Sequence, residues 1–289
     1  MCCEMKPNRP STLSWPRWSA YRLHAHRWVY ADGERCEPYE VTGADDLVAH
    51  LAAAAGQQGD RLEDRIPRLL KFYEAFGLLG ETTLFGARGV IFSRRHEVRA
   101  GDSVAWALRH ARNIRLILSL DRERGVALDR LMAALAEGRG ERPLRGLGRS
   151  EDATAVRHQP SLQIPTCIDR RQSVLKINLG EEYERTRASG PGLRLLALRV
   201  IGELLNPNLA SVPRTFDPDT GEARFRFTAL IQAVYWQLAD RLGHHKVRRC
   251  PCGGLFFQSD PRQRYCPPLL GRKDSQCAQR FRRRRVRNL

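Results

Sequence analysis

Residues 250–266 read CPCGGLFFQSDPRQRYC, and one more cysteine follows after a further ten residues. The segment therefore holds four cysteines within 28 residues, far more than chance would place there. Structural zinc is bound by four ligands in a tetrahedron, and cysteine thiolates are among the ligands it prefers. We therefore predict a structural Zn²⁺ site in this segment. Its predicted ligands are Cys250, Cys252, Cys266 and Cys277.

The residues between the cysteines predict how this segment folds. Gly253 and Gly254 tolerate a positive φ, which suits a tight turn beside the first two sulfurs. Asp260-Pro261 marks a second reversal, so residues 255–265 are interpreted as a β-hairpin. A helix should begin near Cys277. A module this small buries too little apolar surface to fold alone, so the metal would supply much of its folding free energy. The aromatic side chains expected to cover the metal are Phe256, Phe257 and Tyr265.

Two alternatives to this ligand set stay open at the sequence level. Only one residue separates Cys250 from Cys252, so the pair could fail to chelate one ion together. In that case His244 or His245 could replace one of them. The other alternative is that the cysteines are buried inert thiols or a redox pair.

An arginine-rich stretch follows the last cysteine. Residues 241–289 hold 14 Lys or Arg against two acids, a net charge of +12, whereas the preceding 240 residues carry only +5. Guanidinium groups form paired hydrogen bonds with phosphate, so a basic helix here indicates contact with nucleic acid. The alternative is a solvated tail. The residue types do not separate DNA from RNA. The predicted contacts are Arg280, Arg282, Arg283, Arg284, Arg285 and Arg287.

This segment resembles the CGNR-type zinc finger family of bacterial proteins. Shared features are the paired cysteines, a glycine, a phenylalanine, a turn, an aromatic-cysteine pair and a final cysteine before an Arg-rich helix. Residues 277–280 read Cys-Ala-Gln-Arg where the family has Cys-Gly-Asn-Arg, and both cysteine spacings differ from the family's. The helix at 227–242 also resembles the one that closes the family's larger N-terminal, ABATE-type domain. The resemblance implies DNA binding by a transcriptional regulator.

The composition of the whole chain limits the remaining classes. With 42% hydrophobic residues in 289, most of the chain should fold around a sizeable core. No apolar run approaches the roughly 20 residues of a membrane helix, and residues 1–10 lack the apolar stretch of a secretory leader. We therefore expect no membrane partner, a cytoplasmic location and reduced cysteines, which favours metal binding over disulfides.

Apolar periodicity predicts an α+β, mainly α protein. Residues 1–243 should form a large helical domain of unknown role with a loop or linker at 138–150, and residues 244–289 a treble-clef-like zinc finger. A β-hairpin is expected across 162–179, and a turn-rich loop at 216–221. A strand is expected at 21–30, and the predicted helices are 45–55, 62–76 (starting only near Ile66 because of Pro67), one from Ser103, 126–137, 192–205 (ended by Asn206-Pro207) and 227–242.

The sequence contains no motif of a known catalytic site. There is no phosphate-binding glycine loop, no dinucleotide fingerprint and no nucleophile elbow. His110 stands alone near Trp106 and is interpreted as a packing or surface residue. We therefore predict a zinc-dependent nucleic-acid-binding regulator rather than an enzyme. For residues 1–243 an enzyme stays an open alternative. The alternative function is a protein-interaction module whose finger and arginines dock an acidic partner.

Overall fold

The computed structural model describes most of the chain, including all four cysteines of the predicted zinc site. The predicted loop or linker at residues 138–150 lies outside the described residues. Within the described part, helices predominate over strands, which confirms the prediction of a mainly helical chain with small sheets. The described residues are 14–41, 47–57, 60–85, 100–136, 163–168, 173–174, 179–218, 221–242, 244–268 and 272–287.

The elements alternate between short antiparallel strand pairs and helices along the chain. The strands are β1 (Ser14–Trp18), β2 (Tyr21–His24), β3 (Trp28–Ala31), β4 (Arg35–Glu40), β5 (Gly101–Ser103), β6 (Gln163–Ile164), β7 (Ser173–Val174), β8 (Arg214–Asp217), β9 (Glu222–Phe225), β10 (Val247–Arg249) and β11 (Leu255–Phe257). The helices are α1 (Leu47–Ala54), α2 (Leu62–Phe76), α3 (Glu81–Phe85), α4 (Val104–Ala136), α5 (Leu179–Thr186), α6 (Gly190–Leu209), α7 (Leu230–Leu242) and α8 (Gln276–Arg287). None of the helices in the described ranges has the length and apolar character needed to cross a membrane.

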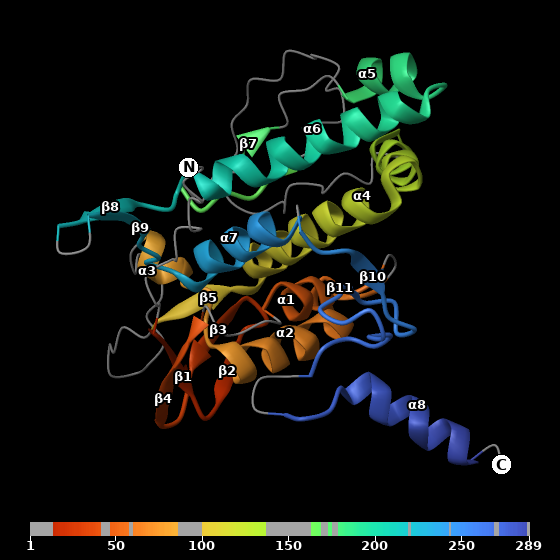
Figure 1. Cartoon of the computed structure of the whole chain (residues 1–289). Helices are drawn as coiled ribbons and strands as arrows, with labels where there is room; N and C mark the ends of the chain where they lie inside the picture. Colours follow the sequence, from red (N-terminus) through yellow and green to blue (C-terminus); the bar gives the residue numbers. More distant parts are fainter. Residues whose placement is uncertain are drawn as a thin grey trace, which may run out of the picture.

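Helix α4 is the centre of the fold. It packs against α6 on one side and α1 on the other, while α7 contacts all three of these helices (Figure 1). Their facing side chains, together with those of α2, form one continuous apolar cluster, which we call the main core. Ile114 of α4, Leu204 of α6 and Leu238 of α7 are each at most 1% exposed. Burying one such side chain contributes about 1.5–3 kcal/mol, so the main core stabilises the body of the protein.

The start of α4 confirms the helix predicted from Ser103. The Ser103 hydroxyl accepts the Trp106 amide at 3.1 Å, which satisfies one of the free amides of the first turn. The further short helix predicted at 126–137 is confirmed as the second part of α4, which ends at Ala136. A kink at Arg124, whose φ is 26° and ψ is −89°, divides the helix and explains why the sequence pattern changes there.

Two prolines lie inside helices, one of which was expected to begin just before its proline and the other to end before its proline. Helix α2 begins at Leu62 rather than near Ile66, because the Asp64 carboxylate accepts the Arg61 amide at 3.1 Å and fixes the first turn. Helix α6 continues through Pro207 to Leu209, because Leu205 and Asn208 near its end are buried. The side-chain amide of Asn208 donates to the Pro165 carbonyl at 3.0 Å. A local cap in α2 and a tertiary contact in α6 thus offset the cost of proline.

The predicted strand at residues 21–30 is a hairpin instead. Strands β2 and β3 pair antiparallel, and the turn at residues 25–27 places Ala25 and His26 at φ values of 47° and 54°. These are left-handed conformations that non-glycine residues rarely adopt, so the residue types gave little sign of the turn. Strand β5 adds a third strand beside β3.

A separate pair, β1 and β4, is fixed to the end of α2. The Trp15 indole donates to the Leu78 carbonyl at 2.8 Å, and the Tyr39 hydroxyl donates to the Phe76 carbonyl at the same distance. The helix ends at Gly77, as predicted, with φ at 87° and its amide bonded to the Tyr73 carbonyl. These bonds satisfy carbonyls that the end of α2 would otherwise leave free.

Two further hairpins follow α4 in sequence. The β6–β7 pair confirms the hairpin predicted across 162–179, although its strands are only two residues each. Of the loop expected at 216–221, Phe216 and Asp217 belong to strand β8, which pairs with β9, and residues 219–220 lie outside the described residues. Helix α7 begins at Leu230 rather than Phe227, because the Gln232 side chain accepts the Thr228 amide at 2.8 Å and caps the helix from within.

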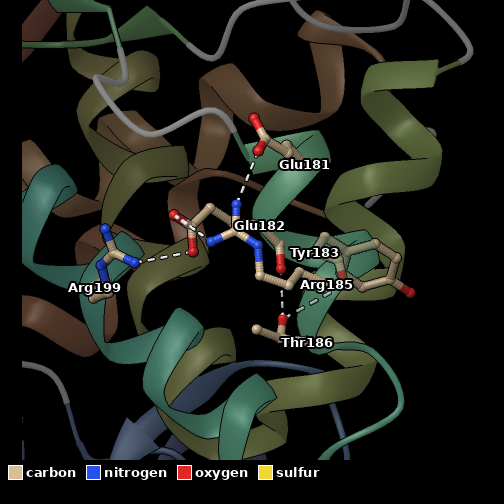
Figure 2. Close-up of polar contacts among 6 residues, drawn as sticks. All are labelled: Glu181, Glu182, Tyr183, Arg185, Thr186 and Arg199. Carbon is tan, nitrogen blue, oxygen red and sulfur yellow. Dashed lines mark hydrogen bonds and ion pairs between the residues drawn. The ribbon is translucent and has the colours of Figure 1, made fainter.

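Helix α5 lies on α6 through polar contacts at its exposed face. Glu182 pairs with Arg199 of α6 at 3.0 Å, and Arg185 pairs with Glu181 one turn away at 2.9 Å (Figure 2). Three of these four side chains are at least 50% exposed and Glu182 is 21% exposed, so each pair contributes at most about 1 kcal/mol. Leu179, which is buried in the main core, is the apolar anchor of this helix.

The C-terminal segment joins the body through the β10–β11 hairpin. Val247, Leu255 and Phe257 of this hairpin belong to the main core, and the hairpin packs against α1 and α4. Arg249 of β10 also pairs with Glu123 of α4 at 2.6 Å. Helix α8, by contrast, lies outside the packed helices (Figure 1). That residues 1–243 fold as a domain of their own stays a prediction.

Candidate metal centre

The first two cysteines lie in the tight turn that connects β10 to β11. The Cys250 amide donates to the Gly254 carbonyl and the Gly253 amide donates to the Cys250 carbonyl, both at 2.8 Å. Gly253 has a φ of 84°, the left-handed conformation that favours glycine. The hairpin predicted at residues 255–265 is therefore wrong. Strand β11 pairs antiparallel with β10, which precedes it in the sequence, and the turn that holds Cys250 and Cys252 is the turn of this hairpin.

The second glycine of the turn provides space for the sulfurs. A Cβ atom at Gly254 would lie 3.1 Å from the Cys266 sulfur and 3.4 Å from the Cys252 sulfur. Gly254 does not adopt a positive φ, so its smallness rather than its backbone freedom is what the site requires. An added side chain would require the Cys266 sulfur to move by a few tenths of an ångström.

The third cysteine is brought back by the turn predicted at Asp260-Pro261. The Gln263 amide donates to the Asp260 carbonyl at 2.9 Å, and the Gln263 side chain accepts the Ser259 amide at 3.0 Å. These bonds reverse the chain without a second strand pair. Cys266 therefore meets the hairpin turn from the opposite direction.

The fourth cysteine lies in the first turn of α8. The helix begins at Gln276, as predicted, and the Ser275 hydroxyl accepts the Ala278 amide at 3.4 Å. The sulfurs of all four cysteines lie within 4.8 Å of one another, and those of Cys252 and Cys266 are 3.5 Å apart. Zinc–sulfur bonds of about 2.3 Å in a tetrahedron place sulfurs roughly 3.8 Å apart. The cluster therefore fits a four-thiolate zinc site.

One face of the cluster is covered by protein and the other is open. Cys250 is 1% exposed and packs with Phe256 and Ala49 of α1, whereas Cys252 is exposed. The rings of Tyr265 and Phe281 lie 5.5 Å apart beside the cluster. Phe256 and Tyr265 thus cover the site as predicted. Phe257 does not, because its side chain belongs to the main core.

The thiols strongly influence one another. Hydrogen bonds from Cys250 and Cys266 lower the pKa of Cys252 to about 2. The same kind of bond, to Cys250 and Cys252, raises the pKa of Cys266 well above its ordinary value, and burial raises that of Cys277 to about 12. A thiolate at one position therefore opposes thiolates at the others. A bound cation removes this conflict, because it favours the thiolate form of every ligand.

The two histidines considered as replacement ligands lie outside the cluster. His244 and His245 are both exposed, and neither belongs to the group of converging ligand atoms in the described residues. The short Cys250–Cys252 pair meets the other two sulfurs without them. The hairpin turn makes this geometry available, because it directs both side chains towards the loop and α8.

The arginines of α8 are only partly described. The side chains of Arg280, Arg282 and Arg283 are exposed, and Arg282 lies 3.8 Å from the exposed Asp274. The side chains of the remaining predicted contacts, Arg284, Arg285 and Arg287, lie outside the described residues. Arg280, Arg282 and Arg283 are therefore accessible to a partner, and no buried ion pair within the described residues holds them.

The sequence did not predict how the body of the protein supports the cluster. His50 of α1 lies 3.3 Å from the Pro268 carbonyl, and the Gln57 side chain donates to the Cys252 carbonyl at 3.3 Å. Burial lowers the pKa of His50, so it bonds as a neutral ring. No local pattern could have indicated these contacts, since they join residues about 200 positions apart.

No family model, curated protein or solved structure matches this chain. The site is therefore interpreted from its own geometry.

Proposed function

We propose that the protein is a zinc-dependent nucleic-acid-binding protein, a bacterial transcriptional regulator whose structural zinc is held by Cys250, Cys252, Cys266 and Cys277. The convergence of these four sulfurs from a hairpin turn, a loop and a helix start is the observation that carries the proposal. Four thiolates fill a tetrahedral site and leave no position for a reactive water, so the metal acts structurally. We assign no catalytic role to the remainder of the chain.

The cysteines would position α8 relative to the body. Cys277 lies in the first turn of the helix, and Cys250 is buried beside α1. A shared cation therefore connects the body to the start of α8, while the rest of the helix projects outwards (Figure 1). A projecting helix of 12 residues is about 18 Å long and narrow enough for the major groove of DNA.

The charge of α8 favours a polyanion as the partner. Arg280, Arg282 and Arg283 are exposed. Among the described residues, their one ion pair joins Arg282 to Asp274 and is long and exposed. Arginine bonds phosphate in paired geometry, and release of counterions from nucleic acid supplies affinity without sequence choice. We favour DNA over RNA because of the resemblance to CGNR-type fingers. An acidic protein partner is the alternative that the same arginines would serve.

Two measurements test the proposal. Metal analysis of the purified protein should find one zinc per chain. Binding to labelled duplex DNA, followed by fluorescence anisotropy from about 50 mM salt upwards, should weaken steeply as salt rises. The variant Arg280→Gln/Arg282→Gln/Arg283→Gln should reduce the slope of log affinity against log salt by up to about three.

A matched variant controls for net charge. Arg35, Arg194 and Arg226 are exposed residues far from α8 in sequence, and their replacement by Gln removes the same charge. This control should retain the full salt slope. Equal losses in both triple variants, or no binding to duplex DNA at low salt, would contradict the nucleic-acid proposal. In the second case an acidic protein would become the expected partner.

A further inference from the structure

An open cleft of about 370 Å³ adjoins the cysteine cluster. Its size falls within the range of small-molecule sites. One wall comes from the body, through the end of α1, the middle of α2 and Arg115 of α4. The other wall is the metal module, namely the cysteine turn, Cys266-Pro267 and residues 275–277 with Arg280 of α8. A ligand in this cleft would touch both parts at once.

Four of the side chains that line the cleft are positively charged. Arg68, Lys71, Arg115 and Arg280 contribute to its walls, and no aspartate or glutamate does so among the described residues. Only Arg68 has an acidic partner, Asp60 at 2.5 Å. Within the described part of the chain, no ion pair is found for the other three. Like charges held this close repel one another, so an anion between them would be stabilised.

Arg115 is the most enclosed of these cations. It is half-buried on α4, and burial, with Arg249 and Arg68 nearby, lowers its pKa against the attraction of Asp60. Its guanidinium therefore lies in a positive field that water only partly screens. Four thiolates around one Zn²⁺ would carry a formal charge of −2, which together with the carboxylate of Asp60 offsets three of the four positive charges.

The chemistry of the walls narrows the class of ligand. Guanidinium and ammonium groups together suit phosphate, which accepts several charge-assisted bonds. Gln57, Ser275 and Gln276 offer neutral polar groups. Phe72, which is 1% exposed, and Ala53 form an apolar floor that would suit the organic part of a phosphorylated compound.

We propose that this cleft is a binding site for a phosphate group, with Arg115 as its central contact and with Lys71, Arg68 and Arg280 around it. The site goes beyond nucleic-acid binding by α8, because it needs neither the end of that helix nor a duplex. The phosphate belongs either to a free phosphorylated ligand or to the backbone of a bound nucleic acid. Since both walls contact it, its binding would fix the start of α8 against the body.

Isothermal titration of the full-length, zinc-loaded protein with inorganic pyrophosphate at constant ionic strength tests the site. Binding should saturate near one equivalent, and Arg115→Gln should weaken it about tenfold or more, since a charged hydrogen bond is lost. Lys71→Gln, an exposed change that leaves α4 intact, should weaken it in the same direction. Arg194→Gln on α6 is the matched control and should bind as the wild type does.

Circular dichroism and zinc content of each variant establish that it is folded and loaded. A second variant, Arg282→Gln/Arg283→Gln, removes charge from α8 outside the cleft and should keep pyrophosphate affinity. The proposal is overturned if the wild type shows no saturable binding. It is equally overturned if Arg115→Gln and Lys71→Gln both bind normally, or if only the α8 variant loses affinity.

Competition with duplex DNA identifies the source of the phosphate. If pyrophosphate displaces DNA and Arg115→Gln weakens both, the cleft holds a backbone phosphate. If pyrophosphate and DNA bind together, the cleft holds a free phosphorylated ligand. A protein that binds no DNA but still binds pyrophosphate through Arg115 would contradict the proposed function while supporting this site.

Discussion

The β10–β11 hairpin and helix α8 lie within 41 residues of one another, yet they are held in place by different means. The hairpin places Val247, Leu255 and Phe257 in the main core. Among its described side chains, helix α8 buries only Ala278 and half-buries Gln276, Cys277 and Phe281. The comparison teaches that the cysteine module is divided energetically. Apolar burial should hold its first half, and the metal its second.

The largest expected effect separates these two halves. Cys277→Ser should weaken zinc binding and release residues 272–287 from the body, because this cysteine joins α8 to the cluster. Structural zinc supplies about 10–16 kcal/mol in small fingers, so amide protection in α8 should be lost. Hydrogen exchange with mass spectrometry should still find residues 247–257 protected.

Cys36→Ser is the matched control, since Cys36 lies on β4 away from the cluster. It should change neither zinc content nor exchange. If residues 247–257 lose protection together with α8 in Cys277→Ser, the metal holds the whole segment and the comparison is wrong.

The next effect tests the apolar half. Leu255→Ala should destabilise the whole protein by about 3 kcal/mol, because it removes a side chain that is 2% exposed in the main core. Urea unfolding followed by tryptophan fluorescence measures this change. Leu195→Ala, at a position 62% exposed, should change stability by less than about 0.5 kcal/mol. Equal midpoints for Leu255→Ala and wild type would mean that the hairpin folds apart from the body.

The same division explains what the sequence could predict. Local signals sufficed where one residue decides the structure, as with the Ser103 cap, the reversal at Asp260-Pro261 and the start of α8 near Cys277. The four cysteines could be grouped because metal ligands are recognised by type and spacing. These features depend on bonds between residues close in sequence.

Long-range packing decided the rest. Strand β11 was predicted to pair with residues that follow it, whereas it pairs with β10, which precedes it. The sequence around Val247 gave no sign of a strand, because its burial depends on the main core. Pro207 was expected to end a helix that a tertiary contact extends past it. The basic cleft could not be predicted, since Arg115 precedes the cysteines by more than 130 residues and meets them only in the fold.

A smaller effect concerns a polar centre in the main core. His110 is fully buried, and its Nδ1 lies 2.9 Å from the Tyr235 hydroxyl, which also accepts the Asn113 amide at 3.0 Å. Burial, with Arg109 nearby, lowers the pKa of His110 to about 3. Below about pH 6.5, His110 therefore binds a proton in the unfolded chain but stays neutral in the folded chain until the pH approaches 3. Stability should be full above that pH and fall as pH decreases, by up to about 1.4 kcal/mol per unit.

His110→Gln should flatten this slope between about pH 6.5 and 4.5, since it removes the titrating group. Urea unfolding with a chelator present keeps metal loss equal in both proteins. An unchanged slope in the variant would assign the acid sensitivity to another group. A flattened slope would show that the body, unlike α8, has an acid sensitivity independent of metal.

The smallest expected effect is electrostatic and concerns the ion pair between the β10–β11 hairpin and α4. Arg249 of β10 pairs with Glu123 of α4 at 2.6 Å, and their side chains are 35% and 18% exposed. A double-mutant cycle with Arg249→Gln and Glu123→Gln should give a coupling of about 0.5–1 kcal/mol that decreases at high salt. Arg130 also pairs with Glu123, at 2.9 Å, and would keep part of that carboxylate's stabilisation when Arg249 is replaced. A coupling of several kcal/mol would mean that this ion pair, rather than the apolar side chains, fixes the hairpin to α4, and the contrast between a core-held hairpin and a metal-held helix would have to be redrawn.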